Sequence, residues 1–358
     1  MDMIMKRLES FREKLKLKGM DAALVTKREN CIYLSGFTGT SACLLISEED
    51  ALLVTDFRYI EQAAAQAPLF ETVQYGGKIV NTLNNLLNKK GIKRLGFEEH
   101  YLTVGKYSEY KSGFEIKDFL PLGNTIESLR MVKSGEEIEA IRKAVKIAED
   151  SFTHILGYIK PGVKEIEIAA ELEYHMKKQG ASGTSFETIA ASGKRSAMPH
   201  GTASDKVLQC GEALTLDFGC IYEGYCSDMT RTVFLGNPDP EIKKIYGIVL
   251  EAQVKASEGA RRGLKGREID YIARKIISDY GYEKSFGHGL GHGVGLEVHE
   301  EPRLSPNGDI VMEDKMVVTV EPGIYISGLG GVRIEDMIII DSDNPDVLNN
   351  STKDMIII

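Results

Sequence analysis

Apolar positions in the first third of the chain follow the helical period in some stretches and form short continuous runs in others. Leu8, Phe11 and Leu15 recur at helical spacing, which predicts an amphipathic helix over residues 5–18. The same reasoning predicts helices at 59–67 and 81–90 and strands at 22–26, 32–34, 42–47, 51–55 and 94–98. Helices that alternate with strands are typical of an α/β domain, which we place at residues 1–124.

The rest of the chain, residues 125–358, repeats one pattern twice. Ser134 followed by two glutamates predicts a helix N-terminus. Three pairs of segments match between the copies: 136–157 with 240–262, Lys164–Ala169 with Arg267–Ala273, and Thr215–Gly219 with Thr319–Gly323. In this match Glu165 corresponds to Glu268. We infer two similar halves, each with two helices and part of a sheet, related by a pseudo-twofold axis.

A glycine-rich stretch at Phe286–Pro302 carries three of the seven histidines. Glycine occupies every second position over 287–295, and each glycine costs a helix about 1 kcal/mol relative to alanine. We therefore predict an extended segment whose bare glycine face lets another group approach the backbone. Because side chains alternate along a strand, four of them should share the other face: His288, Leu290, His292 and Val294. We expect the chemistry to lie here.

Acidic residues interrupt or end the apolar strands predicted in both halves. The strands concerned are 213–218, 225–235, 316–320 and 331–340. A Tyr-Glu-Gly turn makes the first two antiparallel neighbours, which brings Asp217 beside Asp228. Glu321 ends the third strand and Glu335 lies in the fourth. With His292 these acids form an oxygen-rich set, which suits two divalent ions that share bridging ligands, because clustered buried carboxylates repel without cations.

Each acid taken alone also has a structural explanation. Asp217 would be a solvated strand end, Asp228 would pair with Arg231, and Glu335 would pair with Arg333. The placement favours a site nevertheless, since each acid interrupts an apolar strand and a buried acid needs a partner.

Composition excludes several classes of function. The chain has 358 residues and a net charge of −9, and it has no long basic block, so we expect no nucleic-acid partner. The first residues carry Lys and Arg without an apolar core, and no run reaches membrane-spanning length, so we expect no membrane and a cytoplasmic protein. The five cysteines show no C-x-x-C spacing, which argues against a cysteine zinc site.

The five residues Asp217, Asp228, His292, Glu321 and Glu335, with the motifs Gly-His-Gly-Leu-Gly-His-Gly and Gly-Val-Arg-Ile-Glu-Asp, resemble one known family. This pattern is similar to that of the proline-specific metallopeptidases of the pita-bread fold, namely aminopeptidase P and prolidase, which are related to methionine aminopeptidase. The resemblance extends from residue 134 to the end. It implies an α+β pita-bread catalytic domain at 125–358, preceded at 1–124 by the α/β domain of aminopeptidase P, prolidase and creatinase.

The resemblance also implies a role for each matching residue. Two divalent ions, manganese ahead of cobalt, zinc or iron, would be the cofactors. Their ligands would be Asp217 on one ion, Asp228 and Glu335 bridging both, and His292 and Glu321 completing the second. The catalytic set would be Glu321 as proton acceptor, His299 at the oxyanion and His200 at the substrate backbone. The substrate-binding set would be His288 near the proline ring, Arg333 orienting the ligating carboxylates and Arg303 as a clamp for the substrate carboxylate or, equally, a surface residue.

The function that this resemblance implies is hydrolysis of an Xaa-Pro bond. We expect an Xaa-Pro aminopeptidase that acts on peptides with proline at the second position and forms a homodimer. The alternative is prolidase, which accepts only dipeptides. Two further classes match less well: methionine aminopeptidase, which mostly lacks the N-terminal domain, and metal-free creatinase-type hydrolases or binding modules, which lose ligands that this chain keeps.

Overall fold

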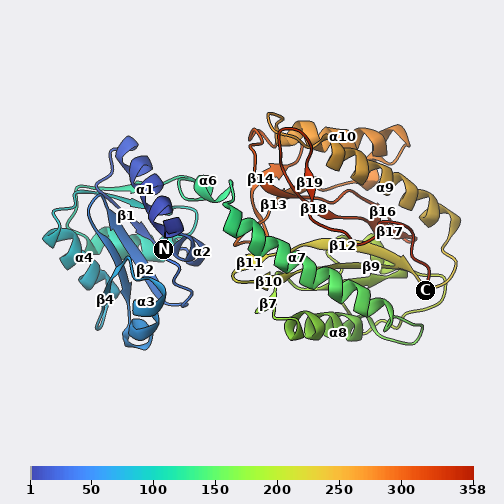
Figure 1. Ribbon diagram of the computed structural model, residues 1–358, viewed down its shortest axis with the longest axis horizontal. Coiled ribbons are helices and arrows are strands. Elements are labelled where there is room, and N and C mark those ends of the chain that lie inside the picture. The colour runs from blue at the N-terminus through green and yellow to red at the C-terminus, as the bar shows by residue number, and fades with distance from the viewer. Residues whose placement is uncertain (1) are drawn as a thin grey trace. The chain divides into compact units, whose positions relative to one another are not determined.

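The computed structural model describes residues 2–358, and the chain divides into two compact units, Met1–Arg130 and Met131–Ile358 (Figure 1). No helix within the described residues combines the length and the apolar character needed to cross a membrane. The division falls after the short helix α6 (Glu127–Arg130), later than the boundary at 124 drawn from the sequence. Asn30 explains the difference, because its side chain hydrogen-bonds both Glu127 and Arg130 and so holds α6 to the first unit.

The first unit is an α/β domain, as the sequence predicts. Its mixed six-stranded sheet has the order β4-β3-β2-β1-β5-β6. The strands are β1 (Ala22–Val25), β2 (Ala42–Ser47), β3 (Ala51–Thr55), β4 (Glu71–Gln74), β5 (Arg94–Phe97) and β6 (Asp118–Pro121). The remaining helices are α1 (Asp2–Leu17), α2 (Arg28–Ser35), α3 (Ile60–Gln66), α4 (Ile79–Lys89) and α5 (Val104–Gly113). Buried apolar side chains from β1, β2, β3 and α4 form the core of this unit.

The strand predicted at 32–34 is wrong, because these residues lie in helix α2. A three-residue apolar run fits a buried helix as well as a strand. Gly36 ends the helix in the left-handed conformation (φ 79°) and donates its N–H to Ile32 O at 2.8 Å. The helical conformation of these residues therefore depends on a C-cap, Gly36, which the apolar pattern does not show.

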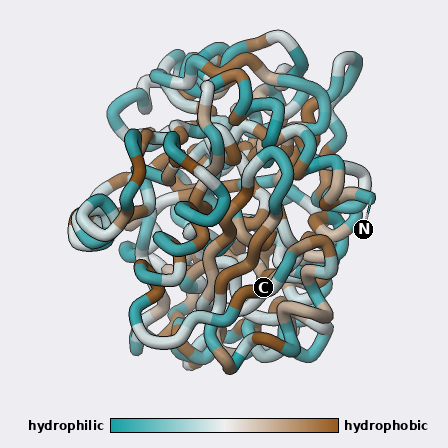
Figure 2. The backbone as a smooth tube through the Cα atoms, turned by 90° about the vertical axis from the view of Figure 1, so that its left-hand side faces the viewer, coloured by the Kyte–Doolittle hydropathy of each residue, from teal (hydrophilic) through white to brown (hydrophobic). Residues whose placement is uncertain are grey.

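The second unit consists of two similar halves. In Figure 1 the helices α7 and α8 lie on one side of the strands, and α9 and α10 lie on the other. The helices are α7 (Gly135–Leu156), α8 (Glu165–Lys178), α9 (Pro240–Gly259) and α10 (Gly266–Asp279). One hydrophobic cluster joins α7 and α8 to the strands β8, β9 and β12, and a second joins α9 and α10 to β15 and β18. In Figure 2 hydrophobic segments (brown) lie in the interior and hydrophilic loops (teal) lie at the outline.

The strands of the second unit form small antiparallel sheets. One has the order β12-β9-β8, one β14-β13-β15-β18-β19, one β11-β10-β7, and β16 pairs with β17. Their bounds in the first half are β7 (Gly183–Thr184), β8 (Ile189–Ser192), β9 (Ala213–Phe218), β10 (Cys220–Tyr222), β11 (Tyr225–Cys226) and β12 (Met229–Phe234). In the second half they are β13 (Gly291–Gly293), β14 (Glu300–Leu304), β15 (Val317–Val320), β16 (Gly323–Ile326), β17 (Gly330–Arg333), β18 (Asp336–Ile339) and β19 (Asp346–Val347).

The two halves match at their helix starts, although not in the register that the sequence suggested. The carboxylate of Glu167 accepts the Lys164 N–H, and Glu268 accepts the Lys265 N–H in the same way, both at 2.7 Å. Glu268 therefore corresponds to Glu167 and not to Glu165. Glu165 is a fully buried acid whose carboxylate accepts hydrogen bonds from two serines and forms an ion pair with an arginine, so it holds a loop in place.

Candidate metal centre

One cavity of about 450 Å³ in the second unit brings together the residues chosen from the sequence. All ten line it: His200, Asp217, Asp228, His288, His292, His299, Arg303, Glu321, Arg333 and Glu335. The volume lies in the range of small-molecule sites. Residues separated by more than 100 positions in the sequence thus meet at one place.

Three of these side chains are close enough to share one ion. A ligand atom of Asp228, one of His292 and one of Glu335 all lie within 4.8 Å of one another, and all three residues are buried. His292 Nε2 also lies 3.4 Å from Glu321 Oε1 and 3.7 Å from Asp228 Oδ2. Asp217 lies outside this trio and lines the same cavity.

Each half of the unit supplies two acids at matching points of its strand pair. Asp217 lies near the end of β9, and Asp228 directly precedes β12, its antiparallel partner. Glu321 directly follows β15, and Glu335 directly precedes β18, which pairs with β15. The single strand predicted at 331–340 is therefore wrong, because it is two strands, β17 and β18, in different sheets. Glu335 lies in the break between them.

The glycine-rich stretch is only partly extended. Its regular strand is β13, and the register shifts between His292 and Gly293. His288 and His292 both line the cavity, whereas Leu290 and Val294 are fully buried in hydrophobic clusters. The prediction that the four side chains share one face is therefore wrong, because the bulge and the irregular flanks break the alternation.

Glycine is needed here because neighbouring backbone comes very close. A Cβ at position 291 would meet the carbonyl oxygen of Thr319 at 2.0 Å, and one at position 293 would meet the carbonyl oxygen of Glu301 at 2.2 Å. The glycine face, which the sequence predicted would let another group approach the backbone, is therefore the face against which adjacent strands pack. This close packing fixes the backbone that carries His292.

Arg333 supports Asp217 rather than Glu335. Its guanidinium donates to Asp217 Oδ2 at 2.5 Å and to the Tyr325 hydroxyl at 2.8 Å. Its Nε donates to Thr230 Oγ1 at 3.2 Å, and that hydroxyl donates to Glu335 Oε2 at 2.7 Å. Asp217 Oδ1 is buried without a hydrogen-bond partner in the described chain, so it is an acceptor available to a cation.

Backbone contacts set the orientation of two histidine rings. Nδ1 of His292 lies 3.2 Å from Gly293 O, so the proton there leaves a lone pair on Nε2, which faces the acids. Nδ1 of His288 lies 2.8 Å from Gly289 O, and its Nε2 lies 3.0 Å from the Tyr325 hydroxyl. Both nitrogens of His288 are therefore engaged, and its ring is what it presents to the cavity.

The other three cavity residues lie at the accessible side of the site. His200 and Arg303 are exposed, and neither side chain has a hydrogen bond or ion pair within residues 2–358. The His299 ring packs edge-on against His292 with centroids 4.3 Å apart. Burial, followed by the charges of His292 and Arg303, lowers the pKa of His299 to about 4. His299 is therefore neutral at pH 7 and keeps one N–H to donate.

The acids carry a large electrostatic cost in the absence of cations. Burial raises the pKa of Asp228 and Glu335 well above the ordinary range, and repulsion from neighbouring carboxylates adds to it. Burial also raises the pKa of Asp217, although Arg333 offsets part of the rise. Burial would raise the pKa of Glu321 as well, but His292, His288 and Arg333 together outweigh it and the net shift is downward.

These observations fit a pair of divalent ions. Four carboxylates and one imidazole converge, and Arg333 balances the charge of Asp217 alone. Asp217 Oδ1 lacks any donor in the described chain, and the imidazole presents a lone pair. The oxygen-rich donor set suits manganese, cobalt, iron or zinc and does not select among them.

Some cavity and supporting residues were missed by the sequence analysis. Phe186, Glu187 and Ile189 line the cavity, and Ile189 pairs directly with Asp217 across β8 and β9. Thr230 and Tyr325 hold the acids and histidines in place. Thr230 alone left a trace in the sequence, because it lies two residues after Asp228 and a strand would place both side chains on one face.

Comparisons with known proteins agree with this arrangement. Residues 139–342 match Metallopeptidase family M24, and residues 7–132 match the Creatinase/Prolidase N-terminal domain. The Xaa-Pro dipeptidase of Pyrococcus horikoshii is 41% identical over 358 residues, covering 99% of this chain and 100% of the relative.

Solved structures show the same fold across the whole chain. The Xaa-Pro dipeptidase from Bacillus anthracis superposes with a TM-score of 0.97 at 47% identity, covering 99% of this chain and 100% of that one. An X-Pro aminopeptidase from Thermotoga maritima gives 0.90 at 41% identity, covering 97% and 100%. The chain belongs to metallopeptidase family M24 and has the pita-bread fold of the prolidases.

Asp228→Asn tests whether the acid cluster exists to hold cations. Removing one carboxylate should lower manganese affinity by more than the roughly 100-fold typical of an outer-shell partner. The metal-free variant should unfold at a temperature no lower than the wild type, because one buried like charge is gone. Calorimetric titration with manganese and thermal unfolding of the metal-free proteins measure both effects. Asp205→Asn, at an exposed aspartate, is the control, and unchanged metal affinity in Asp228→Asn would contradict the assignment.

Proposed function

We propose that this M24 family member is an Xaa-Pro dipeptidase whose two divalent ions are held by Asp217, Asp228, His292, Glu321 and Glu335. The observation that carries the proposal is the content of one cavity. It holds the uncompensated acids together with the unpartnered guanidinium of Arg303. The names of the Bacillus anthracis and Pyrococcus horikoshii relatives support the same substrate class.

The target bond needs a dedicated site because the proline nitrogen is tertiary and has no N–H to donate. Divalent ions bound to the acids would supply positive charge and make a water acidic enough to attack at neutral pH. The carboxylate of Glu321 lines the cavity, and His292 lowers its pKa. It is therefore ionised and able to accept a proton from the attacking water. It then returns that proton to the proline nitrogen as the bond breaks.

The histidines at the accessible side complete the site. His299 is neutral and donates its N–H to the oxygen of the attacked carbonyl as negative charge develops there. The His200 side chain has no hydrogen-bond partner within the described chain and is free to bind the substrate backbone. His288, with both nitrogens engaged, offers its ring as a wall for the proline.

Arg303 decides the length of the substrate. An arginine binds a carboxylate through two parallel hydrogen bonds, and this one lines the cavity with its donors unused in the described chain. A free carboxylate directly after the scissile bond is present only in a dipeptide. This reverses the order that the sequence suggested, in which the aminopeptidase came first.

The second candidate is an Xaa-Pro aminopeptidase that accepts longer peptides. The X-Pro aminopeptidase from Thermotoga maritima supports it, at 41% identity and a TM-score of 0.90. In that case Arg303 would be a surface residue, and the peptide would continue past it into solvent.

Arg303→Ala separates the two candidates. Wild-type enzyme with manganese should hydrolyse Gly-Pro much better than Gly-Pro-amide or Gly-Pro-Ala. The variant should lose about 10- to 100-fold in kcat/KM for Gly-Pro alone, as expected for a charged hydrogen-bonded pair of about 1.5–3 kcal/mol. Steady-state assays of the three substrates measure it, with the exposed Arg261→Ala as control. Equal rates on all three substrates in both proteins would favour the aminopeptidase.

His299→Ala tests the proposed oxyanion contact. We expect kcat for Gly-Pro to fall by about 10²–10³-fold, the scale for losing one oxyanion donor. Metal content should not change, since His299 is not among the proposed ligands. Turnover and metal analysis of the same preparation check both points, with the exposed His100→Ala as control. Loss of metal would instead move His299 into the ligand set.

A further inference from the structure

We infer that a C-terminal strap, defined as Asn349–Lys353, and the buried Arg231–Asp336 ion pair hold Glu335 in position and thereby set the affinity of the metal centre. This inference rests on the proposed function in one respect, namely that Glu335 is a metal ligand. Arg231 and Asp336 would act through Glu335 and would touch neither substrate nor ion. They are therefore positioning residues.

Glu335 is held at both its backbone and its side chain by two adjacent residues of β12. Its N–H donates to Thr230 O at 3.1 Å, and its carboxylate accepts from Thr230 Oγ1 at 2.7 Å. Its carbonyl oxygen accepts from the Arg231 guanidinium at 2.6 Å. Since Glu335 lies in the break between β17 and β18, these contacts replace the ladder that would fix a residue inside a strand.

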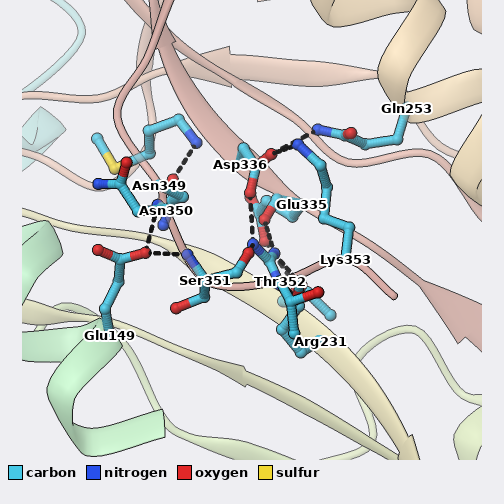
Figure 3. A network of polar contacts seen from close by, with 12 residues as sticks. Glu149, Arg231, Gln253, Glu335, Asp336, Asn349, Asn350, Ser351, Thr352 and Lys353 are labelled. Atoms are coloured by element: carbon cyan, nitrogen blue, oxygen red, sulfur yellow. Dashed lines mark hydrogen bonds and ion pairs between the residues drawn. The ribbon is translucent and has the colours of Figure 1, made fainter. Parts of the chain in front are cut away.

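Arg231 uses all five of its N–H donors in this region. Two go to the carbonyl oxygens of Thr230 and Glu335, at 2.9 and 2.6 Å. The other three go to Asp336 Oδ1 at 2.7 Å, Ser351 O at 2.8 Å and Thr352 O at 3.0 Å. Figure 3 shows the guanidinium between Asp336 and the strap. Lysine has three donors on a single nitrogen and cannot reproduce this set of contacts.

The strap closes the network from behind. Lys353 Nζ lies 2.5 Å from Asp336 Oδ2, to which Gln253 of α9 also donates at 3.1 Å. At its other end the strap is anchored to α7, where Glu149 accepts the N–H groups of Asn350 and Ser351 at 2.5 Å. The labelled side chains of Figure 3 follow this path from Glu149 to Lys353.

The network supports one proposed ligand and leaves the others to different contacts. Asp217 is held by Arg333, and the His292 N–H donates to Thr319 Oγ1. Because every donor of Arg231 is accounted for, none reaches Asp217, Asp228 or Glu321. A purely structural ion pair would stabilise metal-free and metal-bound protein equally and leave the affinity unchanged. Positioning of Glu335 instead predicts a change in affinity.

Arg231→Lys in the full chain is the test. The metal-free protein is titrated with manganese by calorimetry, and its fold is checked by circular dichroism and thermal unfolding. We expect manganese affinity to fall by about 10- to 100-fold, the range for partners that orient a ligand. Excess manganese should restore most of kcat. The control is Arg142→Lys, because Arg142 pairs with Asp346 in the same C-terminal segment without contacting Thr230, Glu335 or Asp336.

Lys353→Met provides a second variant that is more certain to fold, because the Lys353 side chain is 25% exposed. Asp336 keeps Arg231 and Gln253 there, so we expect a smaller loss of affinity, of a few fold. Wild-type affinity in both folded variants would overturn the inference, and so would an equal loss in Arg142→Lys. If Arg231→Lys does not fold, Lys353→Met decides alone. Fewer than one manganese ion bound by the wild type would instead contradict the proposed function.

Discussion

Mutual repulsion among buried carboxylates is the constraint on which the second unit depends. Asp217, Asp228 and Glu335 have raised pKa values because they lose water and face one another. One buried cation, Arg333, reaches Asp217 and cannot balance the whole set. Such a cluster persists only where the surrounding chain is rigid enough to hold it and where cations complete it. The stability of this unit and its chemistry are therefore linked at the same residues.

The two similar halves hold the acids in place by supplying them from equivalent positions. Each half has a pair of helices packed on a pair of antiparallel strands, and each places one acid at the end of one strand and one acid just before the next. The acids are thus fixed by backbone hydrogen bonding of the strands. His292 enters between them on a strand whose glycines allow neighbouring carbonyl groups within 2.0–2.2 Å of where a Cβ would be. No larger residue fits there without moving the strands.

The sequence predicts most helices and strands from periodicity, and it predicts the meeting of the four acids with His292 from acids placed in apolar strands. His200, His299, Arg303 and Arg333 were assigned to the same site by the family resemblance, and all four line the cavity. Prediction from the sequence fails where a backbone irregularity or a tertiary partner determines the local structure or the contact. The 32–34 run becomes helical through the Gly36 cap, and Leu290 and Val294 lie in the core on either side of a register shift after His292. The arginine partners also differ from those named as structural alternatives. Arg333 lies beside Asp217, and Arg231 lies beside Asp336. Nearness in sequence suggested Asp228 for Arg231 and Glu335 for Arg333, whereas the partners come from distant strands.

Donor count separates the acids that build the fold from those that await a ligand. Glu98 of the first unit is buried, yet its carboxylate accepts from Asn30, from Thr26 and from the Lys27 N–H. Glu165 and Asp336 are likewise surrounded by protein donors. Among the described residues, however, no hydrogen bond reaches the carboxylate of Asp228, and one oxygen of Asp217 has none. A buried carboxylate with too few protein donors must find its partner in something bound, because desolvation cannot otherwise be offset. That shortage, more than the number of acids, supports the proposal of a cation site in this cavity.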